Sequence, residues 1–379
     1  MKKICFVVTT PFTVNGFLIC HLTELAKVYQ VSLCINLNQY ELSPKLDISH
    51  MEIIHVPLER KISPLRDLQA WWKLFCIFSH QHFDSIHSVT PKAGLLGMTA
   101  AFMARVPRRF HTFTGQIWIN QFGLKRFIFK NVDWVIAKCA SFVFADSASQ
   151  IRFLVKEGVC PSDKIAMLGE GSISGVDLER FHPNAQMRMQ LRQEFGAAEQ
   201  DFVFLFVGRL CRDKGVFDLL EAFSKIKSIS QNAALWIVGP DEEGVRAQVK
   251  EQFPEIDAVV KWIGPTFSPE DYMAAADVLL LPSYREGFGS VIIEAAACYL
   301  PTIAYRIDGV IDAVVDSKTG LLVDMGNVVE LERQMANLLL DPTLRNRLGT
   351  SAGERAQRDF SSKKVTGAWL EFYANTLKR

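Results

Sequence analysis

Short apolar runs alternate with amphipathic stretches along the chain, and this alternation limits the fold more than any other feature. In the first half the apolar runs predict strands over Ile4–Thr10, Val31–Leu37, Ile53–Val56, Asp84–Ser88, Arg109–Phe113 and Phe142–Ala145. Helical periodicity lies between several of them, over Gly16–Val28, Leu65–Gln81, Lys92–Arg105, Gly123–Lys138 and Ala148–Glu157. Strands that alternate with helices indicate a parallel sheet that is covered on both faces.

The second half follows the same pattern without repeating the sequence. Its predicted strands are Phe202–Val207, Ala234–Val238, Val259–Ile263, Val278–Leu281, Thr302–Ala304 and Leu321–Val323. Helices are expected to begin near Gly215, Val245, Ser268 and Ser290, and three more are expected over Val328–Leu340, Thr343–Leu348 and Ser362–Leu377. A length of 379 residues suits two domains rather than one core.

The domain boundary is expected within residues 169–184, where glycines and Pro183 interrupt both periodicities. We therefore predict an α/β fold of two doubly wound, Rossmann-like domains that face a cleft, over residues 1–172 and 173–379. The last helix is a candidate to pack back on the first domain. Ligands of such domains bind at the carboxyl ends of the strands.

The net charge is close to zero, but the charge is unevenly distributed. The chain has 42 Lys and Arg against 41 Asp and Glu, which gives no overall case for a nucleic-acid partner. Residues 1–180 carry 20 basic and 14 acidic side chains, whereas the remainder carries 22 and 27. The 8 cysteines are widely spaced and include no Cys-x-x-Cys pair, so we expect reduced thiols in a cytoplasmic protein. The first apolar run is too short for a signal peptide, and no run of about 18 apolar residues predicts a membrane span.

The most informative segment is residues 281–294, Leu-Pro-Ser-Tyr-Arg-Glu-Gly-Phe-Gly-Ser-Val-Ile-Ile-Glu. A strand ends at Leu281, two glycines form a turn, and a helix starts near Ser290. The free N–H groups at such a helix start bind phosphate or sugar oxygens. Glu286 and Glu294 are about 12 Å apart if helical, beyond the roughly 5 to 9.5 Å of a glycosidase carboxylate pair, so they suit the two ends of an elongated ligand.

This segment resembles the signature of the retaining glycosyltransferases of the GT-B fold, in the large family 4 that includes bacterial capsule and O-antigen enzymes. Three further motifs extend the resemblance over most of the second half: residues 206–215 (Phe-Val-Gly-Arg-Leu-Cys-Arg-Asp-Lys-Gly), residues 175–181 (Gly-Val-Asp-Leu-Glu-Arg-Phe) and residues 319–323 (Thr-Gly-Leu-Leu-Val). The turn at Asp308-Gly309-Val310-Ile311 departs from the family pattern, and Asp312 stands where the family often has Glu.

The resemblance implies roles for the site residues in binding a nucleotide-sugar donor. Glu294 is expected to bind the ribose, while catalytic Glu286 and the amides of Gly287, Phe288 and Gly289 hold the hexose. Arg209 and Lys214 are expected to bind the diphosphate and to stabilise the charge on the leaving group. The family needs no metal for this step, and the sequence has no Asp-x-Asp, so neither a metal nor a cofactor is expected.

The first half gives weaker indications. Gly16 is all that remains of the family's glycine-rich loop, and an ordinary strand-to-helix turn is the alternative. Lys92, at a helix start, is a candidate to bind an anionic acceptor, and the alternative is an ordinary surface lysine. His111 resembles the family histidine that faces the donor sugar and is a second catalytic candidate, with a structural role as the alternative.

Residues 102–132 combine six cations with seven aromatic side chains and have no acidic residue. Upstream, Arg60, Lys61, Arg66 and Lys73 flank Trp71 and Trp72. This composition fits the surface of an anionic membrane, because cations meet headgroups and rings lie at the acyl boundary. The alternative is that the rings are core and the cations ordinary surface.

Together these observations predict a retaining, metal-independent hexosyltransferase. It would move a hexose from a UDP-linked donor to a polyprenyl-diphosphate-linked saccharide, as a peripheral membrane protein at the cytoplasmic face of the inner membrane. Two alternatives remain: a sugar-nucleotide epimerase of the same fold, and a non-catalytic nucleotide-sugar-binding subunit.

Overall fold

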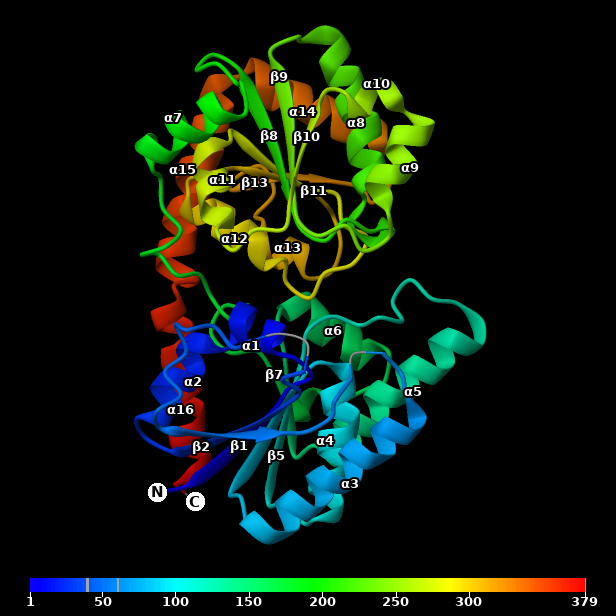
Figure 1. Ribbon diagram of the computed structural model, residues 1–379, viewed down its shortest axis with the longest axis vertical. Coiled ribbons are helices and arrows are strands. Elements are labelled where there is room, and N and C mark those ends of the chain that lie inside the picture. Colours follow the sequence, from blue (N-terminus) through cyan, green and yellow to red (C-terminus); the bar gives the residue numbers. More distant parts are fainter. Residues whose placement is uncertain (39–40, 60, 379) are drawn as a thin grey trace. The chain divides into compact units, whose positions relative to one another are not determined.

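The computed structural model describes residues 1–38, 41–59 and 61–378. The chain divides into two compact units (Figure 1). The first comprises Met1–Gly175 together with the C-terminal helix α16 (Ser362–Leu377), and the second is Val176–Ser361. Each unit contains its own sheet and its own hydrophobic cores.

Seven parallel strands form the first sheet in the described residues, in the order β3-β2-β1-β4-β5-β6-β7. The strands are β1 (Lys3–Val7), β2 (Gln30–Ile35), β3 (Met51–His55), β4 (Ser85–Val89), β5 (Arg108–Phe113), β6 (Phe142–Ala145) and β7 (Ile165–Ala166). The helices are α1 (Pro11–Phe17), α2 (Ile19–Ala26), α3 (Pro64–Gln81), α4 (Pro91–Met103), α5 (Gly123–Cys139) and α6 (Ala148–Lys156). The order reverses between β1 and β4, as in a doubly wound fold.

Both faces of this sheet are covered, as β1 illustrates. Cys5 and Val7 pack into a core with α3, α4 and α5, whereas Ile4 and Phe6 pack into a core with α2 and α16. A strand buried on both faces needs apolar residues throughout rather than at every second position. This is why the strands of the first half appear in the sequence as continuous apolar runs.

Two buried histidines attach α16 to the first unit. His21 Nε2 donates to the carbonyl oxygen of Ile173 at 2.6 Å, and its Nδ1 lies 2.8 Å from Thr366 Oγ1. His87 lies 2.7 Å from the Tyr373 hydroxyl, and the Trp369 ring stacks on both imidazoles. Burial lowers the pKa of His21 to about 4, so the ring is neutral at pH 7 and makes these contacts without a buried charge.

Six parallel strands form the second sheet in the described residues, in the order β10-β9-β8-β11-β12-β13. The strands are β8 (Phe202–Val207), β9 (Ala233–Val238), β10 (Val260–Gly264), β11 (Val278–Leu281), β12 (Thr302–Tyr305) and β13 (Gly320–Val323). The helices are α7 (Ala185–Glu194), α8 (Val216–Ile229), α9 (Val245–Gln252), α10 (Pro254–Asp257), α11 (Pro269–Ala275), α12 (Ser290–Ala297), α13 (Val310–Ala313), α14 (Val328–Leu340) and α15 (Pro342–Asp359). The prediction of two doubly wound, Rossmann-like α/β sheets is confirmed.

Two helices differ from the sequence prediction. The helix expected from Gly16 begins earlier, at Pro11, because proline is well suited to the first helical position. It is also divided at Leu18 into α1 and α2. The helix expected over Thr343–Leu348 continues to Asp359. Two of its glycines are needed for packing: a Cβ on Gly349 would lie 2.3 Å from the Tyr299 carbonyl oxygen, and one on Gly353 would lie 2.9 Å from the Tyr299 ring.

Candidate functional site

The candidate site lies in the second unit, where the strand order reverses between β8 and β11. The loops that follow these two strands leave the same edge of the sheet in opposite directions. Such a switch point is where doubly wound domains bind ligands. The loop after β8 carries Arg209 and Lys214, and the loop after β11 carries Glu286 and the two glycines of the motif.

The two loops are packed backbone against backbone. Gly215 adopts a φ of +65°, and a Cβ at this position would lie only 1.9 Å from the carbonyl oxygen of Pro282. The amide of Tyr284 donates to the carbonyl oxygen of Asp213 at 2.9 Å. Position 215 therefore requires glycine for two reasons: the two loops approach closely there, and the backbone adopts a positive φ.

The start of α12 has the geometry that the glycine turn predicts. Gly289 adopts a φ of +78° as the N-cap residue. The Phe288 side chain is buried and packs against Phe360, with ring centroids 5.3 Å apart, so only its backbone is available to a ligand. Ser283 is fully buried, and its Oγ has no hydrogen-bond partner in the structure.

Each of the two predicted diphosphate-binding cations is paired with a carboxylate. Lys214 Nζ lies 2.5 Å from Glu286 Oε1, and both side chains are mostly buried. Arg209 Nη1 donates to Glu242 Oε2 at 2.6 Å, and about a third of each of these side chains is exposed, at 31% and 33%. The structure therefore brings Glu286 and Lys214 together at the switch point, with Arg209 on the same loop as Lys214.

Glu294 lies on α12, about one turn beyond the loop, and its carboxyl group is more desolvated than an exposed carboxylate. Burial raises its pKa to about 7, although the Arg180 guanidinium acts in the opposite direction. Arg180 is held by two hydrogen bonds of 2.7 Å to the carboxylate of Glu270. At neutral pH the Glu294 carboxyl is therefore present in both protonation states, and its oxygens can donate to or accept from hydroxyl groups.

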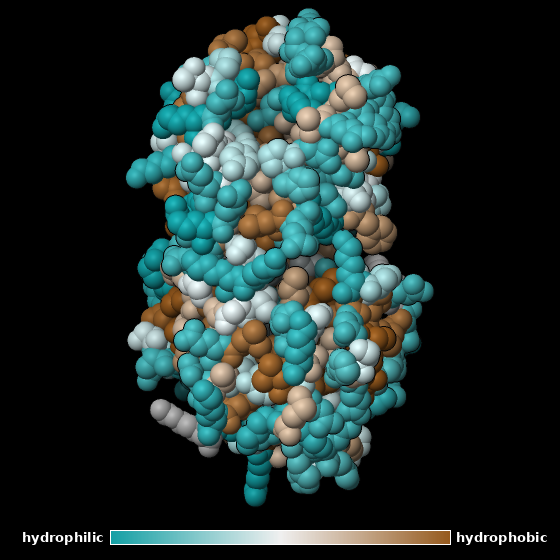
Figure 2. All heavy atoms as spheres, turned by 90° about the vertical axis from the view of Figure 1, so that its left-hand side faces the viewer, coloured by the Kyte–Doolittle hydropathy of each residue, from teal (hydrophilic) through white to brown (hydrophobic). Residues whose placement is uncertain are grey.

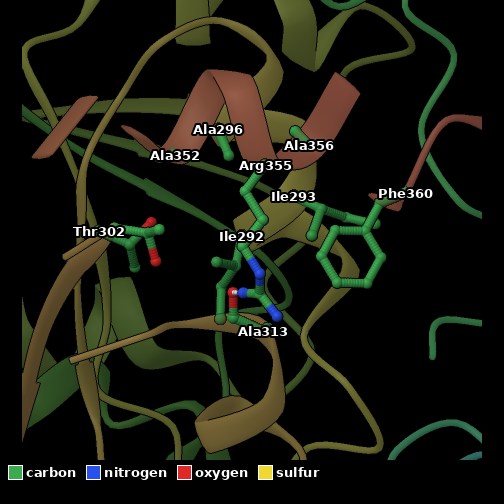
Figure 3. Close-up of a pocket in the computed structure, with 10 residues that line it drawn as sticks. Ile292, Ile293, Ala296, Thr302, Ala313, Ala352, Arg355, Ala356 and Phe360 are labelled. Atoms are coloured by element: carbon green, nitrogen blue, oxygen red, sulfur yellow. Dashed lines mark hydrogen bonds between the residues drawn. The ribbon is translucent and has the colours of Figure 1, made fainter. Parts of the chain in front are cut away.

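A third loop, after β12, completes this edge of the sheet. A Cβ on Gly309 would lie 2.5 Å from the Gly287 carbonyl oxygen, so the turn that departs from the family pattern packs directly on the motif. Behind it, Arg355 donates to the carbonyl oxygen of Ala313 at the end of α13 (Figure 3). It also donates to the carbonyl oxygen of Asp312. The adjacent cavity is only about 10 Å³, which is room for one water molecule at most.

In the first unit, His111 lies within β5 and is fully buried. Its Nδ1 lies 2.8 Å from Ser88 Oγ, whereas Nε2 is buried and has no hydrogen-bond partner among the described residues. Gly94 makes room for the ring, because a Cβ there would lie 2.5 Å from His111 Cε1. Burial lowers the pKa of His111 to about 3, so the ring is neutral at pH 7 and has one nitrogen left for a further hydrogen bond.

Lys92 lies at the helix start that the sequence predicts, whereas Gly16 lies in a different setting. Lys92, at the start of α4, forms an ion pair of 2.6 Å with Asp67 and also donates to the Lys61 carbonyl oxygen. Gly16 lies inside α1 rather than in a turn, at an exposed position with open space around it.

The basic and aromatic residues of segment 102–132 do not form one surface. The segment crosses the sheet as β5, so its first residues lie at the amino edge and its last at the carboxyl edge. Phe110, Phe113 and Trp118 are buried in the core. Arg126 and Lys130 pair with Glu157. The exposed rings and cations nearest the carboxyl edge lie at the start of α5, and the predicted Arg60 lies outside the described residues.

Several residues that shape the site were not predicted. Asp218 on α8 accepts hydrogen bonds of 2.6 Å from the hydroxyls of both Tyr284 and Tyr305, which anchors the loop after β11. Glu242 and Arg355 were also missed. Asp218 follows the Lys-Gly motif by three residues, but only the fold brings it to the two tyrosines.

Two doubly wound domains, the second with paired cations and a glycine-capped helix at its switch point, have the architecture of the GT-B fold. The model of the family described as glycosyl transferases group 1 matches residues 187–355. The chain is 31% identical over 330 residues to the capsular polysaccharide biosynthesis glycosyltransferase CapM of Staphylococcus aureus, covering 86% of each protein. The chain therefore belongs to the glycosyl transferases group 1 family.

One further relative is similar in sequence, and one solved structure is similar in fold. The UDP-Gal:alpha-D-GlcNAc-diphosphoundecaprenol alpha-1,3-galactosyltransferase of Escherichia coli is 26% identical over 294 residues, covering 76% of this chain and 74% of that protein. The structure of Anabaena Alr3699/HepE in complex with UDP-glucose has a TM-score of 0.80 and 21% identity, over 99% of this chain and 100% of that one. The resemblance to GT-B glycosyltransferases is confirmed.

Proposed function

We propose that the protein is a retaining hexosyltransferase that takes its sugar from a UDP-linked donor and transfers it to a lipid-linked saccharide in cell-surface polysaccharide synthesis. The observation that carries the proposal is the pairing of Lys214 with Glu286 at the switch point of the second sheet, beside the glycine-capped start of α12. A relative whose name includes UDP-Gal and a diphosphoundecaprenol acceptor supports the donor and acceptor classes.

In this proposal the second unit binds the donor. Arg209 and Lys214 bind the diphosphate, and the amides of Gly287, Phe288 and Gly289 face the hexose with Glu286. The carboxyl group of Glu294 binds the ribose hydroxyls, and its pKa of about 7 suits a group that must both donate and accept hydrogen bonds. The first unit is proposed to bind the acceptor, with Lys92 and Gly16 as candidates. Lys92 would first have to leave Asp67.

The proposed reaction breaks the bond between the anomeric carbon and the diphosphate oxygen and forms a bond from that carbon to the acceptor hydroxyl oxygen. The acceptor proton passes to the leaving diphosphate on the same face of the sugar, which retains the anomeric configuration and requires no protein nucleophile. Glu286 and Lys214 contribute by positioning and by stabilising the charge that develops. His111 is neutral and offers Nε2 as a hydrogen-bonding group, which suits contact with a sugar rather than a charge.

A donor screen tests the function. The purified chain is incubated with UDP-, GDP- and ADP-linked hexoses, with and without a polyprenyl-diphosphate-linked N-acetylglucosamine acceptor, and the release of nucleoside diphosphate is measured. Release of UDP that requires the acceptor, with an α-linked product from an α-linked donor, is expected. Consumption of donor without acceptor would instead indicate an epimerase, and tight binding without turnover would indicate a non-catalytic subunit.

A lipid-linked acceptor requires a route to the membrane, and no described helix is long and apolar enough to cross one. Helices α3 and α5 both follow strands of the first sheet and therefore begin at its carboxyl edge. Here Leu65, Phe122 and Leu124 are 85%, 87% and 72% exposed. Exposed Lys61 precedes α3, exposed Lys125 lies in the first turn of α5, and exposed Lys73 lies farther along α3. Figure 2 shows a different face, that of α2 and α16, on which hydrophilic residues predominate. We propose that the starts of α3 and α5 contact an anionic membrane.

Vesicle binding tests this contact. Replacing Leu65, Phe122 and Leu124 together by glutamate is expected to reduce retention on vesicles containing phosphatidylglycerol at least about tenfold, because three apolar insertions are lost. Phe267→Glu is the matched control, since this ring is 99% exposed in the second unit. Equal retention of the triple variant and the wild type would show that this surface does not meet the membrane.

A further inference from the structure

Glu242 lies directly against Arg209, the cation that the proposed function assigns to the donor diphosphate. The Arg209 Nη1 to Glu242 Oε2 distance is 2.6 Å. We infer that Glu242 competes with the nucleoside diphosphate for Arg209, and so lowers the affinity of the enzyme for its donor and for its product. This inference rests on the proposed donor site and adds a regulatory residue from a fourth loop, the one after β9.

The backbone, and not the ion pair alone, holds Glu242 in this position. The loop after β9 is joined to the loop after β8 by hydrogen bonds from the Leu210 amide to the Pro240 carbonyl oxygen at 2.8 Å and from the Glu242 amide to the Leu210 carbonyl oxygen at 3.2 Å. Asp241 accepts from the amides of Val245 and Arg246 at the start of α9. Removing the Glu242 carboxylate therefore leaves the loop in place.

The loop after β9 carries three consecutive acidic residues, and each has a different role. Asp241 caps α9, and Glu243 accepts a hydrogen bond of 3.0 Å from the backbone amide of Arg212. The Glu242 carboxylate instead lies on the guanidinium of Arg209. With a third of its side chain exposed, Glu242 can turn into solvent when an anion takes its place.

The pairing of Lys214 with Glu286 follows the same pattern on the other side of the switch point. A diphosphate brought to these cations meets two carboxylates that already neutralise them. Binding is then an exchange of anions rather than a neutralisation of free charge. The exchange frees Glu286 to accept hydrogen bonds from the sugar, while Glu242 is displaced without a new partner in the donor. Its contribution to binding is therefore unfavourable.

Binding of UDP to the full chain, followed by calorimetry at fixed salt, tests the inference. Glu242→Gln and Glu242→Ala are both expected to bind UDP about threefold to tenfold more tightly than the wild type, because the diphosphate no longer has to displace a carboxylate from the Arg209 guanidinium. Glu251→Gln, which removes the same charge from the exposed surface of α9, is expected to bind as the wild type does. In an Arg209→Ala background the effect of Glu242→Gln should disappear.

The outcomes separate the inference from the proposed function. If Arg209→Ala and Lys214→Ala weaken UDP binding but the Glu242 variants are not tighter, the competition is refuted and the donor site stands. Weaker binding by Glu242→Ala would show that Glu242 positions Arg209 instead. If Arg209→Ala and Lys214→Ala bind UDP as the wild type does, or if UDP, GDP and ADP all fail to bind, both are overturned.

Discussion

Replacing Glu286 with glutamine is expected to abolish sugar transfer while UDP binding remains at least as tight as in the wild type. The amide keeps the shape of the side chain but loses the charge that pairs with Lys214 at 2.5 Å and that would stabilise a developing positive charge on the sugar. The loss of one electrostatic group aimed at the transition state costs about 100- to 1,000-fold in kcat. Steady-state turnover and calorimetry with UDP measure the two quantities separately.

Glu251→Gln serves as control, because it makes the same substitution on an exposed helix of the same unit. It should retain full turnover. The role assigned to Glu286 is refuted if Glu286→Gln turns over at the wild-type rate. A parallel loss of UDP binding would instead mean that Glu286 maintains the shape of the loop.

Gly215→Ala is expected to destabilise the second unit by about 3 kcal/mol or more and to abolish UDP binding. Two costs add at this position: the left-handed conformation at a φ of +65°, and a Cβ that would lie 1.9 Å from the Pro282 carbonyl oxygen. Because that oxygen belongs to backbone, the clash can be relieved only by moving the loops apart. Thermal unfolding with and without UDP measures both effects.

Gly244→Ala isolates the first cost. Gly244 has the same φ of +65° and also precedes a helix, but nothing lies within 4 Å of a Cβ built on it. A loss of only about 1 to 2 kcal/mol is expected, with UDP binding preserved. Equal destabilisation by the two substitutions would show that the close contact of the loops contributes nothing.

The alternation of apolar runs was sufficient to predict the fold, because buried parallel strands need apolar residues on both faces and the helices between them need only one. The predicted helix boundaries were wrong where tertiary contacts determine the local structure. Gly349 and Gly353 suggest the end of a helix in sequence, yet they allow α15 to approach Tyr299. No local pattern distinguishes a glycine that ends a helix from one that lets it pack.

The same limit applies to the candidate site. The structure brings Glu286, Lys214 and the start of α12 together, because the neighbouring strands β8 and β11 end at one edge of the sheet, and the roles of these residues stay a prediction. The partner of Arg209 was not predicted, since Glu242 follows a strand 33 residues away in sequence. Arg355 and Asp218 support the site from helices, and neither carries a signal beyond an ordinary surface charge. The ion pair between Lys92 and Asp67 could likewise not be predicted from the sequence, because the two residues lie on different helices.

The placement of α16 affects the order in which the two units can fold during synthesis. The first unit contains the first 175 residues and a helix that begins at Ser362, so the part of its sheet face that α16 covers stays uncovered during synthesis until that helix is made. The second unit, although made later, is the first that can be completed, which departs from the usual order in which domains fold as they are synthesised. A chain released early, before Ser362, would lack the α16 partners of His21 and His87 and the Trp369 ring that packs near Phe6, and would expose apolar surface to chaperones and proteases.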